Sequence, residues 1–484
     1  MNHITIDDIC KAVDGSLLIG DGSAEVHTLA IDSREVTAGS FFIPVIGEKV
    51  DAHRFLPEVL RVPGVVGAFT SRHHSIKDLG DLMASWEGAD PKTLPALISV
   101  DDTVAALTAL GHLCRSRVSV PAVGVTGSVG KTSTREMIAT ALSAEKKVYR
   151  TKKNHNSLIG VPLTMAELTD EDDIAVLELG MNVPGELGGI SEMARLSAAV
   201  ITNIGVAHME FYESQEGIAR EKFTITRGLF PGAPLFLNGE DPYLRALAGE
   251  YDHPVTWFGF DEGSDVYADE IVTTQNGSRF VCHMKGKSIP VELTVPGRHH
   301  VLNALAALAV SDFFGVDPVK AAEALKSFSG FQNRLQIEQV GDYKIIDDSY
   351  NASPASMRAG LDVLCDQGDE HFSGKRIAFL GDMLELGKET ERFHMEVGSY
   401  AADQEKLDAI IGVGKLGQKI CEGAAKKLGP SGGKLVAGCN DLDQAFTAFQ
   451  MIAKPGDILY FKASNGMHFK ELIAKIKNEI QDKA

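Results

Sequence analysis

Short apolar runs alternate with amphipathic stretches along most of the chain. The apolar runs at 121–127 and 172–180 are each followed by a glycine-containing loop and then by a helix-like stretch, at 131–144 and 186–196. A third run, at 198–205, leads into a loop that carries a histidine. Because short apolar strands that alternate with helices are typical of βαβ units, we expect a mostly parallel sheet from about residue 120 onward.

The regions on either side of this pattern predict further α/β units. Before it, the strand-like runs 40–47, 65–70 and 95–100 and a helix-like stretch at 104–117 indicate a compact α/β unit that ends near Pro121. After it, a last unit is expected, with strands at 343–348, 375–381, 408–414, 434–438 and 456–462. We therefore predict three α/β domains, with boundaries at 1–117, 118–331 and 332–484.

Residues near 255–295 have a different pattern. Strand-like composition recurs there with little helical periodicity, and Asn276-Gly277 separates two of the runs. An Asn-Gly pair between alternating apolar runs is a strong signal for a tight hairpin. This stretch is therefore expected to form an antiparallel insert within the central domain.

Composition and charge narrow the class of protein. The chain has 484 residues, 44% of them hydrophobic and 23% charged, which is typical of globular proteins and implies several domains. Lys and Arg total 47 against 66 for Asp and Glu, a net charge of −19. A nucleic-acid partner needs a basic footprint, so this balance argues against one.

The cellular location of the protein is predicted from its cysteine spacing, its N-terminal segment and its most apolar stretch. Its six cysteines form no CxxC pair, which is typical of reduced thiols in a cytoplasmic protein. MNHITIDDIC has neither the basic nor the apolar region of a signal peptide, and the apolar stretch 301–316 is too short to span a bilayer. We expect a soluble cytoplasmic protein without membrane insertion.

A glycine-rich loop carries the first chemical signal. The segment Gly127, Ser128, Val129, Gly130, Lys131, Thr132 and Ser133 follows an apolar strand and opens a helix-like stretch. In such loops backbone N–H groups and a helix N-terminus meet a phosphate, the lysine reaches the β- and γ-oxygens, and the hydroxyl can reach Mg²⁺. Only two residues separate Gly127 from Gly130, where the common pattern has four. We predict a phosphate loop of a variant type.

Two further residues follow strands at the same edge of the predicted sheet. Glu178 ends the apolar run 172–180, and His208 comes just after the run 198–205. Open α/β sheets bind ligands at the carboxyl ends of their strands. A carboxylate suits Mg²⁺ well and an imidazole less well, so these two residues are candidate metal ligands.

Several segments together resemble the Mur ligases: TGSVGKTS, KNHNSLIGVPLT, LELGMNVPGE, NIGVAHMEFYESQEGIAREK, PGRHHVLNALAA and DDSYNASPASMRAG. The resemblance covers nearly the whole chain. It implies an N-terminal domain that binds a UDP-linked substrate, a central P-loop-type ATPase domain and a C-terminal Rossmann-like ligase domain. DDSYNASPASM followed by LGDMLELG favours the member that adds D-alanyl-D-alanine.

The resemblance also implies an activity. It is ATP-dependent amide bond formation between UDP-N-acetylmuramoyl-tripeptide and D-alanyl-D-alanine through an acyl phosphate. This reaction belongs to peptidoglycan precursor synthesis, and so to cell wall biogenesis, cell shape and cell division. The implied cofactors are ATP and two Mg²⁺ ions, the partners are small molecules only, and the protein is expected to be a monomer.

Site residues follow from matching positions in the family. Lys131, Lys222, His208 and Asn156 are implied as catalytic, with Lys222 carbamylated so that it offers an anionic oxygen. Metal ligands would be Thr132, Glu178, His208 and Lys222. ATP would further contact Asn303 at the adenine, Arg334 at the phosphates and Asp348 at the ribose, whereas Asp347 would only cap the next turn. Ser33 and Arg34, with Asn154, are the candidates for the UDP-linked substrate.

The chain departs from the family pattern in two places. His300 stands where the family has Asn in a Gly-x-His-Asn segment, and Leu158 stands where relatives carry a polar residue. Other readings are a sister ligase that adds a diamino acid, a folylpolyglutamate synthase, a P-loop switch or kinase, and a non-catalytic UDP-sugar-binding module. The N-terminal segment IDSREVTAGSFFIPVIGEKVDAHRF resembles the uridine-nucleotide-binding domain of the family, which argues against the folate enzyme, and Arg334 with Asp348 argues against a switch.

Overall fold

The computed structural model of the protein describes residues 3–47, 49–71, 80–207, 209–212, 214–330, 334–368, 371–430 and 432–483. The chain divides into two compact units. One unit contains Met1–Val125, Lys146–Ala199 and Thr224–Ala233. The other contains Thr126–Glu145, Val200–Phe223 and Pro234–Ala484. No helix in the described ranges is long and apolar enough to cross a membrane.

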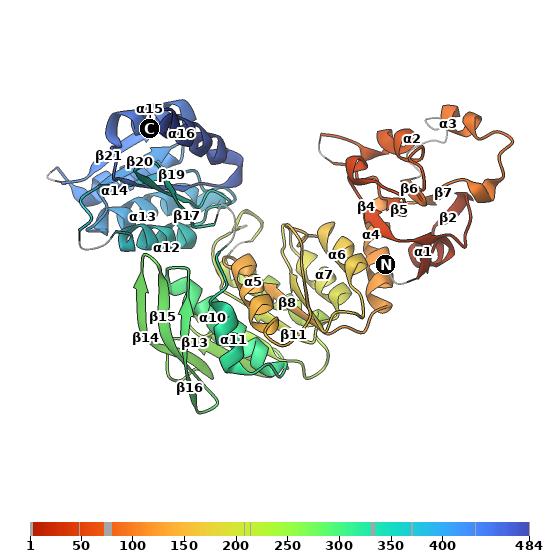
Figure 1. The fold of residues 1–484 in the computed structure, drawn as a ribbon, viewed down its shortest axis with the longest axis horizontal. Helices are drawn as coiled ribbons and strands as arrows, with labels where there is room; N and C mark the ends of the chain where they lie inside the picture. The colour runs from red at the N-terminus through yellow and green to blue at the C-terminus, as the bar shows by residue number, and fades with distance from the viewer. Residues whose placement is uncertain are drawn as a thin grey trace. The chain divides into compact units, whose positions relative to one another are not determined.

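The N-terminal residues form a small α/β sheet, as the apolar runs predict. Its strand order is β2-β7-β6-β5-β4, with β2 antiparallel to β7 and the remaining neighbours parallel. Its strands are β2 Ser16–Ile19, β4 Thr28–Ala30, β5 Ser40–Phe42, β6 Gly67–Ser71 and β7 Ala96–Val100, and β1 Ile4–Thr5 and β3 Glu25–Val26 form a separate antiparallel pair. The helices are α1 Ile6–Val13, α2 Leu56–Val59, α3 Gly80–Ser85 and α4 Thr103–Ser116 (Figure 1).

Helix α4 begins at an Asp102 cap and ends beside a buried arginine. The Arg115 guanidinium donates to the carbonyl oxygens of Val118 (3.0 Å), Val120 (2.9 Å), Ala194 (2.7 Å) and Arg195 (3.1 Å). Carbonyls at a helix C-terminus lack intrahelical partners, and a cation there satisfies them. Arg115 thereby links the end of α4 to the C-terminus of the helix that ends at Ala194.

The central sheet has the order β16-β15-β14-β13-β12-β11-β8-β10-β9 in the described residues. Its strands are β8 Ala122–Thr126, β9 Val148–Arg150, β10 Ile174–Glu178, β11 Ala198–Ile201, β12 Leu235–Asn238, β13 Val255–Gly259, β14 Val266–Thr274, β15 Gly277–Met284 and β16 Lys287–Leu293. Its helices are α5 Lys131–Leu142, α6 Gly160–Glu167, α7 Glu186–Ala194, α8 Gln215–Phe223, α9 Pro242–Leu247, α10 Arg298–Phe313 and α11 Pro318–Leu325. Strand β10 runs parallel to β8 and β9, as expected of βαβ units.

The antiparallel insert is confirmed in part. Strands β14, β15 and β16 are antiparallel neighbours joined by tight turns. The prediction is wrong for β13, which runs parallel to both β12 and β14. Helix α9 and the segment behind it return the chain between β12 and β13, and a parallel neighbour requires such a crossover. The insert therefore begins at β14.

The C-terminal part is an α/β sheet covered on both faces. Its strand order is β17-β18-β22-β19-β20-β21, and β17, which the sequence did not predict, is antiparallel to β18. The strands are β17 Gln336–Val340, β18 Tyr343–Asp347, β19 Arg376–Gly381, β20 Ala409–Val413, β21 Leu435–Cys439 and β22 Ile458–Lys462. The helices are α12 Pro354–Asp366, α13 Thr390–Asp403, α14 Gly417–Leu428, α15 Leu442–Ile452 and α16 Phe469–Lys483.

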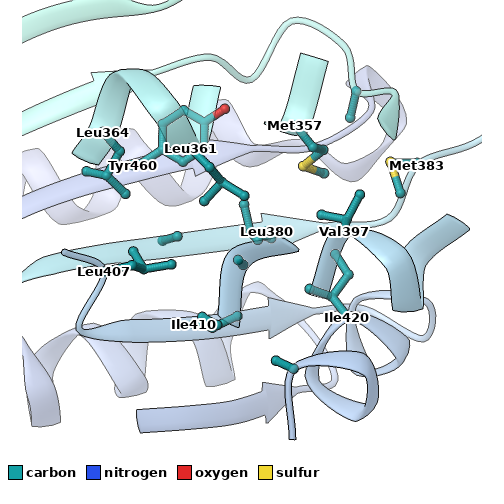
Figure 2. Packing of buried hydrophobic residues seen from close by; sticks show 14 of the residues in the cluster. Met357, Leu361, Leu364, Leu380, Met383, Val397, Leu407, Ile410, Ile420 and Tyr460 are labelled. Carbon is teal, nitrogen blue, oxygen red and sulfur yellow. The ribbon is translucent and has the colours of Figure 1, made fainter. Parts of the chain in front are cut away.

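Two apolar layers hold this sheet. Helices α12, α13 and α14 cover one face, and α15 and α16 cover the other (Figure 1). On the first face Leu361 of α12 and Val397 of α13 pack with Leu380 of β19 and Ile410 of β20, all of them buried (Figure 2). Tyr460 of β22 joins this layer. The strands are apolar on both sides because both faces are covered.

Candidate active site

The loop between β8 and α5 has the local structure that a phosphate loop requires. Gly127 and Gly130 have φ angles of +147° and +86°, a region that side chains other than glycine rarely enter. A Cβ atom on Gly127 would lie 1.9 Å from Oγ1 of Thr202, so only glycine fits there. The Ser128 and Val129 N–H groups donate to the backbone oxygen and Oδ1 of Asn203, at 3.0 and 2.9 Å. These contacts fix the shape of the shortened loop.

The helix behind the loop presents its N-terminus there. Gly130 is the N-cap of α5, and among the described residues no side chain caps that end. Uncapped N–H groups and the helix dipole make such an end favourable for an anion. The Lys131 ammonium donates to the Gly127 oxygen (2.7 Å), so the side chain folds back over the loop. Thr132 is buried and Ser133 half-buried in the first turn.

Lys222 is buried close to this lysine. It lies in α8, its residue is 2% exposed, and it belongs to the same unit as the loop. Burial, and next the positive charge of Lys131, hold the pKa of the Lys222 amine well below its usual range, with Glu221 acting in the opposite direction. The amine is therefore biased toward its neutral, nucleophilic form.

Asn303 adjoins the same loop. It is buried in α10, and its Oδ1 accepts a hydrogen bond from Oγ1 of Thr134 in α5 (2.9 Å). A Cβ atom on Gly130 would lie 3.4 Å from that oxygen. The contact brings a residue 169 positions away in the chain to the first turn of α5, a proximity that only the fold creates.

Glu178 and Asn156 form a second group, described within its own unit. Glu178 ends β10 opposite Val125 of β8, two residues before Gly127, and is 3% exposed. The Asn156 side-chain amide donates to Glu178 Oε1 (2.6 Å), and the Gly180 N–H donates to the Asn156 carbonyl oxygen (2.6 Å). The structure thus brings together two of the residues predicted from the sequence. Asn154 is exposed, and its carbonyl oxygen accepts from the Asn156 N–H (2.8 Å).

The C-terminal candidates surround the end of β18. Arg334 stacks on Tyr350, with its guanidinium carbon 4.2 Å from the ring centre. Asp348 is buried, and its carboxylate accepts from the Leu335 N–H (3.2 Å) and from Lys462 Nζ (2.5 Å). Asp347 accepts from the backbone N–H and hydroxyl of Ser349 (3.0 and 2.6 Å), which confirms its predicted role as a turn cap.

Sequence reasoning missed Lys462 as a member of this group. The lysine closes the apolar strand β22. A charged residue at the end of an apolar strand is the signal that picked out Glu178, and the same signal could have found Lys462.

A pocket of about 220 Å³ lies beside the phosphate loop, within one unit. Ser128 and Val129 form part of its wall together with residues 204–207. Its lining also includes Ser353–Ala355, Arg358, Phe393 and Glu396. The Arg358 guanidinium has a long contact of 3.4 Å with Glu396. The pocket joins the loop to the DDSYNASP segment, a juxtaposition that the sequence alone does not reveal.

The candidates for the uridine end lie in the N-terminal sheet domain. Ser33 and Arg34 belong to a short 3-10 helix at Ser33–Glu35 that Asp32 caps. The Arg34 guanidinium donates to Asp32 (2.5 and 2.9 Å) and lowers the pKa of that carboxyl to about 2, but the Arg34 side chain is 85% exposed. Lys153 reaches Glu35 of the same short helix (3.1 Å).

The remaining candidates are His208 and the histidine pair. His208 lies outside the described residues, and within the described part no cluster of three or more His, Cys, Asp or Glu side chains is placed to hold a metal. His299 and His300 have ring centres 4.2 Å apart. Burial, and next Lys462, lower the pKa of His299 to about 4, and burial holds that of His300 well below its usual range.

Comparison with known proteins supports one family. A model described as the Mur ligase middle domain matches residues 125–311, and one described as the Mur ligase, glutamate ligase domain matches residues 333–465. Two relatives, from Bacillus subtilis and Escherichia coli, are both named UDP-N-acetylmuramoyl-tripeptide–D-alanyl-D-alanine ligase. The first is 34% identical over 97% of each chain, and the second is 34% identical over 87% of this chain and 88% of its own.

Solved structures agree with the sequence matches. MurF from Acinetobacter baumannii superposes with a TM-score of 0.83 at 29% identity over 98% of each chain. MurF ligase from Thermotoga maritima in complex with ADP gives 0.79 at 25% identity, over 95% of this chain and 99% of its own. The chain belongs to the Mur ligase family.

Proposed function

We propose that the protein is the ATP-dependent ligase that joins D-alanyl-D-alanine to UDP-N-acetylmuramoyl-tripeptide, in peptidoglycan precursor synthesis. The observation that carries the proposal is the glycine-shaped loop 127–132 with Lys131 folded over it, in a chain that matches relatives of that name over nearly its whole length. The reaction forms a C–N bond and releases ADP and phosphate.

The chemistry follows from the weakness of a carboxylate as an acyl donor. The terminal carboxylate of the tripeptide attacks the γ-phosphorus of ATP, and ADP leaves. The resulting acyl phosphate is attacked at its carbonyl carbon by the neutral amine of the dipeptide, and phosphate leaves from the tetrahedral intermediate as the amine loses its proton. The protein contributes mainly positioning and charge neutralisation. We assign this role at the β- and γ-phosphates to Lys131, whose ammonium folds back over the loop, and to the N-terminus of α5.

Oxygen donors in the first turn after the phosphate loop and at the end of β10 fit Mg²⁺. Thr132 offers a hydroxyl and Glu178 a buried carboxylate, and Mg²⁺ prefers hard oxygen ligands. We assign these two residues, with His208 and a carbamylated Lys222, to two Mg²⁺ ions. Bound Mg²⁺ would neutralise charge that develops on the transferred phosphoryl group.

Lys222 suits carbamylation because its amine is buried and biased toward the neutral form. A neutral amine adds to CO₂ and loses one proton, which converts the uncharged amine into a carbamate with anionic oxygen ligands. Glu178 would also hold Asn156, the proposed catalytic amide, through the 2.6 Å hydrogen bond between them.

The remaining assignments complete the substrate sites. The loop residues Gly127–Ser133 hold the phosphates, Asn303 contacts adenine, and Arg334 and Asp348 contact the phosphates and the ribose. Ser33 and Arg34, with Asn154, bind the UDP-linked substrate. We further propose a monomer of three domains, 1–117, 118–331 and 332–484, that works in the cytoplasm.

Phosphate release from ATP tests this function. It should require both UDP-N-acetylmuramoyl-tripeptide and D-alanyl-D-alanine, and mass spectrometry should show a product heavier by the dipeptide. Release that needs a diamino acid or glutamate in place of the dipeptide would move the assignment to a sister ligase. Release that needs neither substrate would favour a P-loop switch and reject the ligase.

A further inference from the structure

Lys462 is a buried lysine that the proposed reaction does not use. It closes β22, and its side chain is 3% exposed. Its ammonium donates to Oδ2 of Asp348 (2.5 Å), to the carbonyl oxygen of Asn351 (3.1 Å) and, at 3.5 Å, to that of Asp348. An ammonium has three N–H donors. These three oxygens occupy all of them, so Lys462 has no donor left for a ligand.

The carboxylate of Asp348 has room for about one more donor. Its Oδ1 accepts from the Leu335 N–H (3.2 Å), and its Oδ2 accepts from Lys462 and from the Tyr460 hydroxyl (3.1 Å). A carboxylate offers roughly four acceptor positions, so three are occupied. The side chain is 10% exposed, and the fourth acceptor position would suit a small donor such as one sugar hydroxyl.

Stability alone does not explain this ion pair. Burying two charges costs about as much as their attraction returns, and an apolar pair of similar volume is often equally stable. What the pair does is fix a position. The Asp348 N–H donates to the Phe461 oxygen (3.0 Å), so the backbone of β18 is already held against β22. Lys462 adds the orientation of the carboxylate, at the sheet edge where open α/β sheets bind ligands.

We infer that Lys462 is a positioning residue for the nucleotide. It holds the Asp348 carboxylate oriented so that it accepts one ribose hydroxyl, and through the Asn351 oxygen it anchors the loop that follows. This inference rests on the proposed function, which places Asp348 at the ribose of ATP.

Nucleotide binding by calorimetry tests the inference on the full-length protein. ADP, 2′-deoxyADP and 3′-deoxyADP would be titrated into the wild type, Lys462→Met and Lys475→Met. Lys475 is a matched control, since it is half-exposed and paired with Asp443 on the helices of the other face. The wild type should prefer ADP over one deoxynucleotide by roughly 10-fold or more, the usual worth of a hydrogen bond to a charged group.

Lys462→Met should lose this preference to within about twofold, whereas Lys475→Met should keep it. A Lys462→Met protein with the wild-type preference would overturn the inference. A wild type that binds all three nucleotides equally would overturn it as well, because Asp348 would then not read the ribose.

A second pair of variants covers the case in which Lys462→Met does not fold. Asp348→Asn alone is compared with Asp348→Asn/Lys462→Met, which leaves no orphan charge. If Lys462 acts only through Asp348, the second change should alter ADP affinity by less than about twofold. A further 10-fold loss would reject the inference. Ribose preference without dipeptide-dependent phosphate release would reject the proposed ligase and leave this inference standing.

Discussion

Lys222 and Lys462 are both 2% exposed, yet their surroundings differ in kind. Lys222 lies near a second cation, Lys131, and burial with that charge lowers the pKa of its amine. Lys462 donates to a carboxylate 2.5 Å away and to two carbonyl oxygens. Burial beside a like charge disfavours the charged form of an amine, whereas a carboxylate partner favours it. The same residue type therefore supports two opposite roles.

The largest effect should come from removing the cation beside Lys222. Lys131→Ala is expected to lower dipeptide-dependent phosphate release by roughly 10³-fold, because the phosphates lose their nearest ammonium. The matched control is Lys320→Ala, an exposed lysine paired with Glu145. Phosphate release by Lys131→Ala at the wild-type rate would contradict the phosphate-loop assignment.

Lys222 itself should be replaceable in part by a small anion. Lys222→Ala is expected to lose roughly 10²-fold in kcat, and added formate or acetate should restore a fraction of it by supplying the missing anionic oxygen. Turnover is measured over a carboxylate titration, with chloride at equal ionic strength as the control. Absence of rescue would leave no support for a carbamate at this lysine.

Replacement of Lys462 should lower the free energy of unfolding. Lys462→Met leaves Asp348 buried without its cation, and breaking a buried pair in this way costs about 3 kcal/mol or more. In urea unfolding, the double variant Asp348→Asn/Lys462→Met should recover most of that loss, and Lys475→Met should stay within about 0.5 kcal/mol of the wild type. A double variant no more stable than Lys462→Met would argue against the pair as the cause.

The smallest effect concerns His299, whose pKa is lowered to about 4 by burial and by Lys462. The unfolded chain would bind this proton near pH 6.5, so the contribution of the neutral imidazole is complete above that pH and is lost as the pH falls toward 4. The loss should be no more than about 3 kcal/mol. His299→Gln should reduce the slope of stability between pH 6.5 and 4, of which the buried His300 retains a part, and His468→Gln at an exposed site is the control.

Much of the fold was predictable because it depends on local patterns. The apolar runs at 121–127 and 172–180 became β8 and β10, and their period and glycine boundaries are properties of the chain itself. The predicted direction of strand β13 was wrong. Its composition is that of any strand, and its direction depends on the crossover that precedes it rather than on its residues.

Part of the site was predictable for the same reason. The loop 127–132 and Glu178 could be identified from the sequence because the loop follows an apolar strand and Glu178 ends one. The contact between Asn156 and Glu178, and that between Thr134 and Asn303, join segments distant in sequence. No local sequence pattern predicts which distant segments come into contact.

The sequence by itself determined the residue types, the alternation of strands and helices, and the glycines without which the loop could not turn. The tertiary structure decided the surroundings of each buried ionisable side chain. Burial and the surrounding charges both shift the pKa of an amine, and both depend on which strands and helices the fold brings together. For this reason two lysines that are both buried, Lys222 and Lys462, have different surroundings in the folded protein.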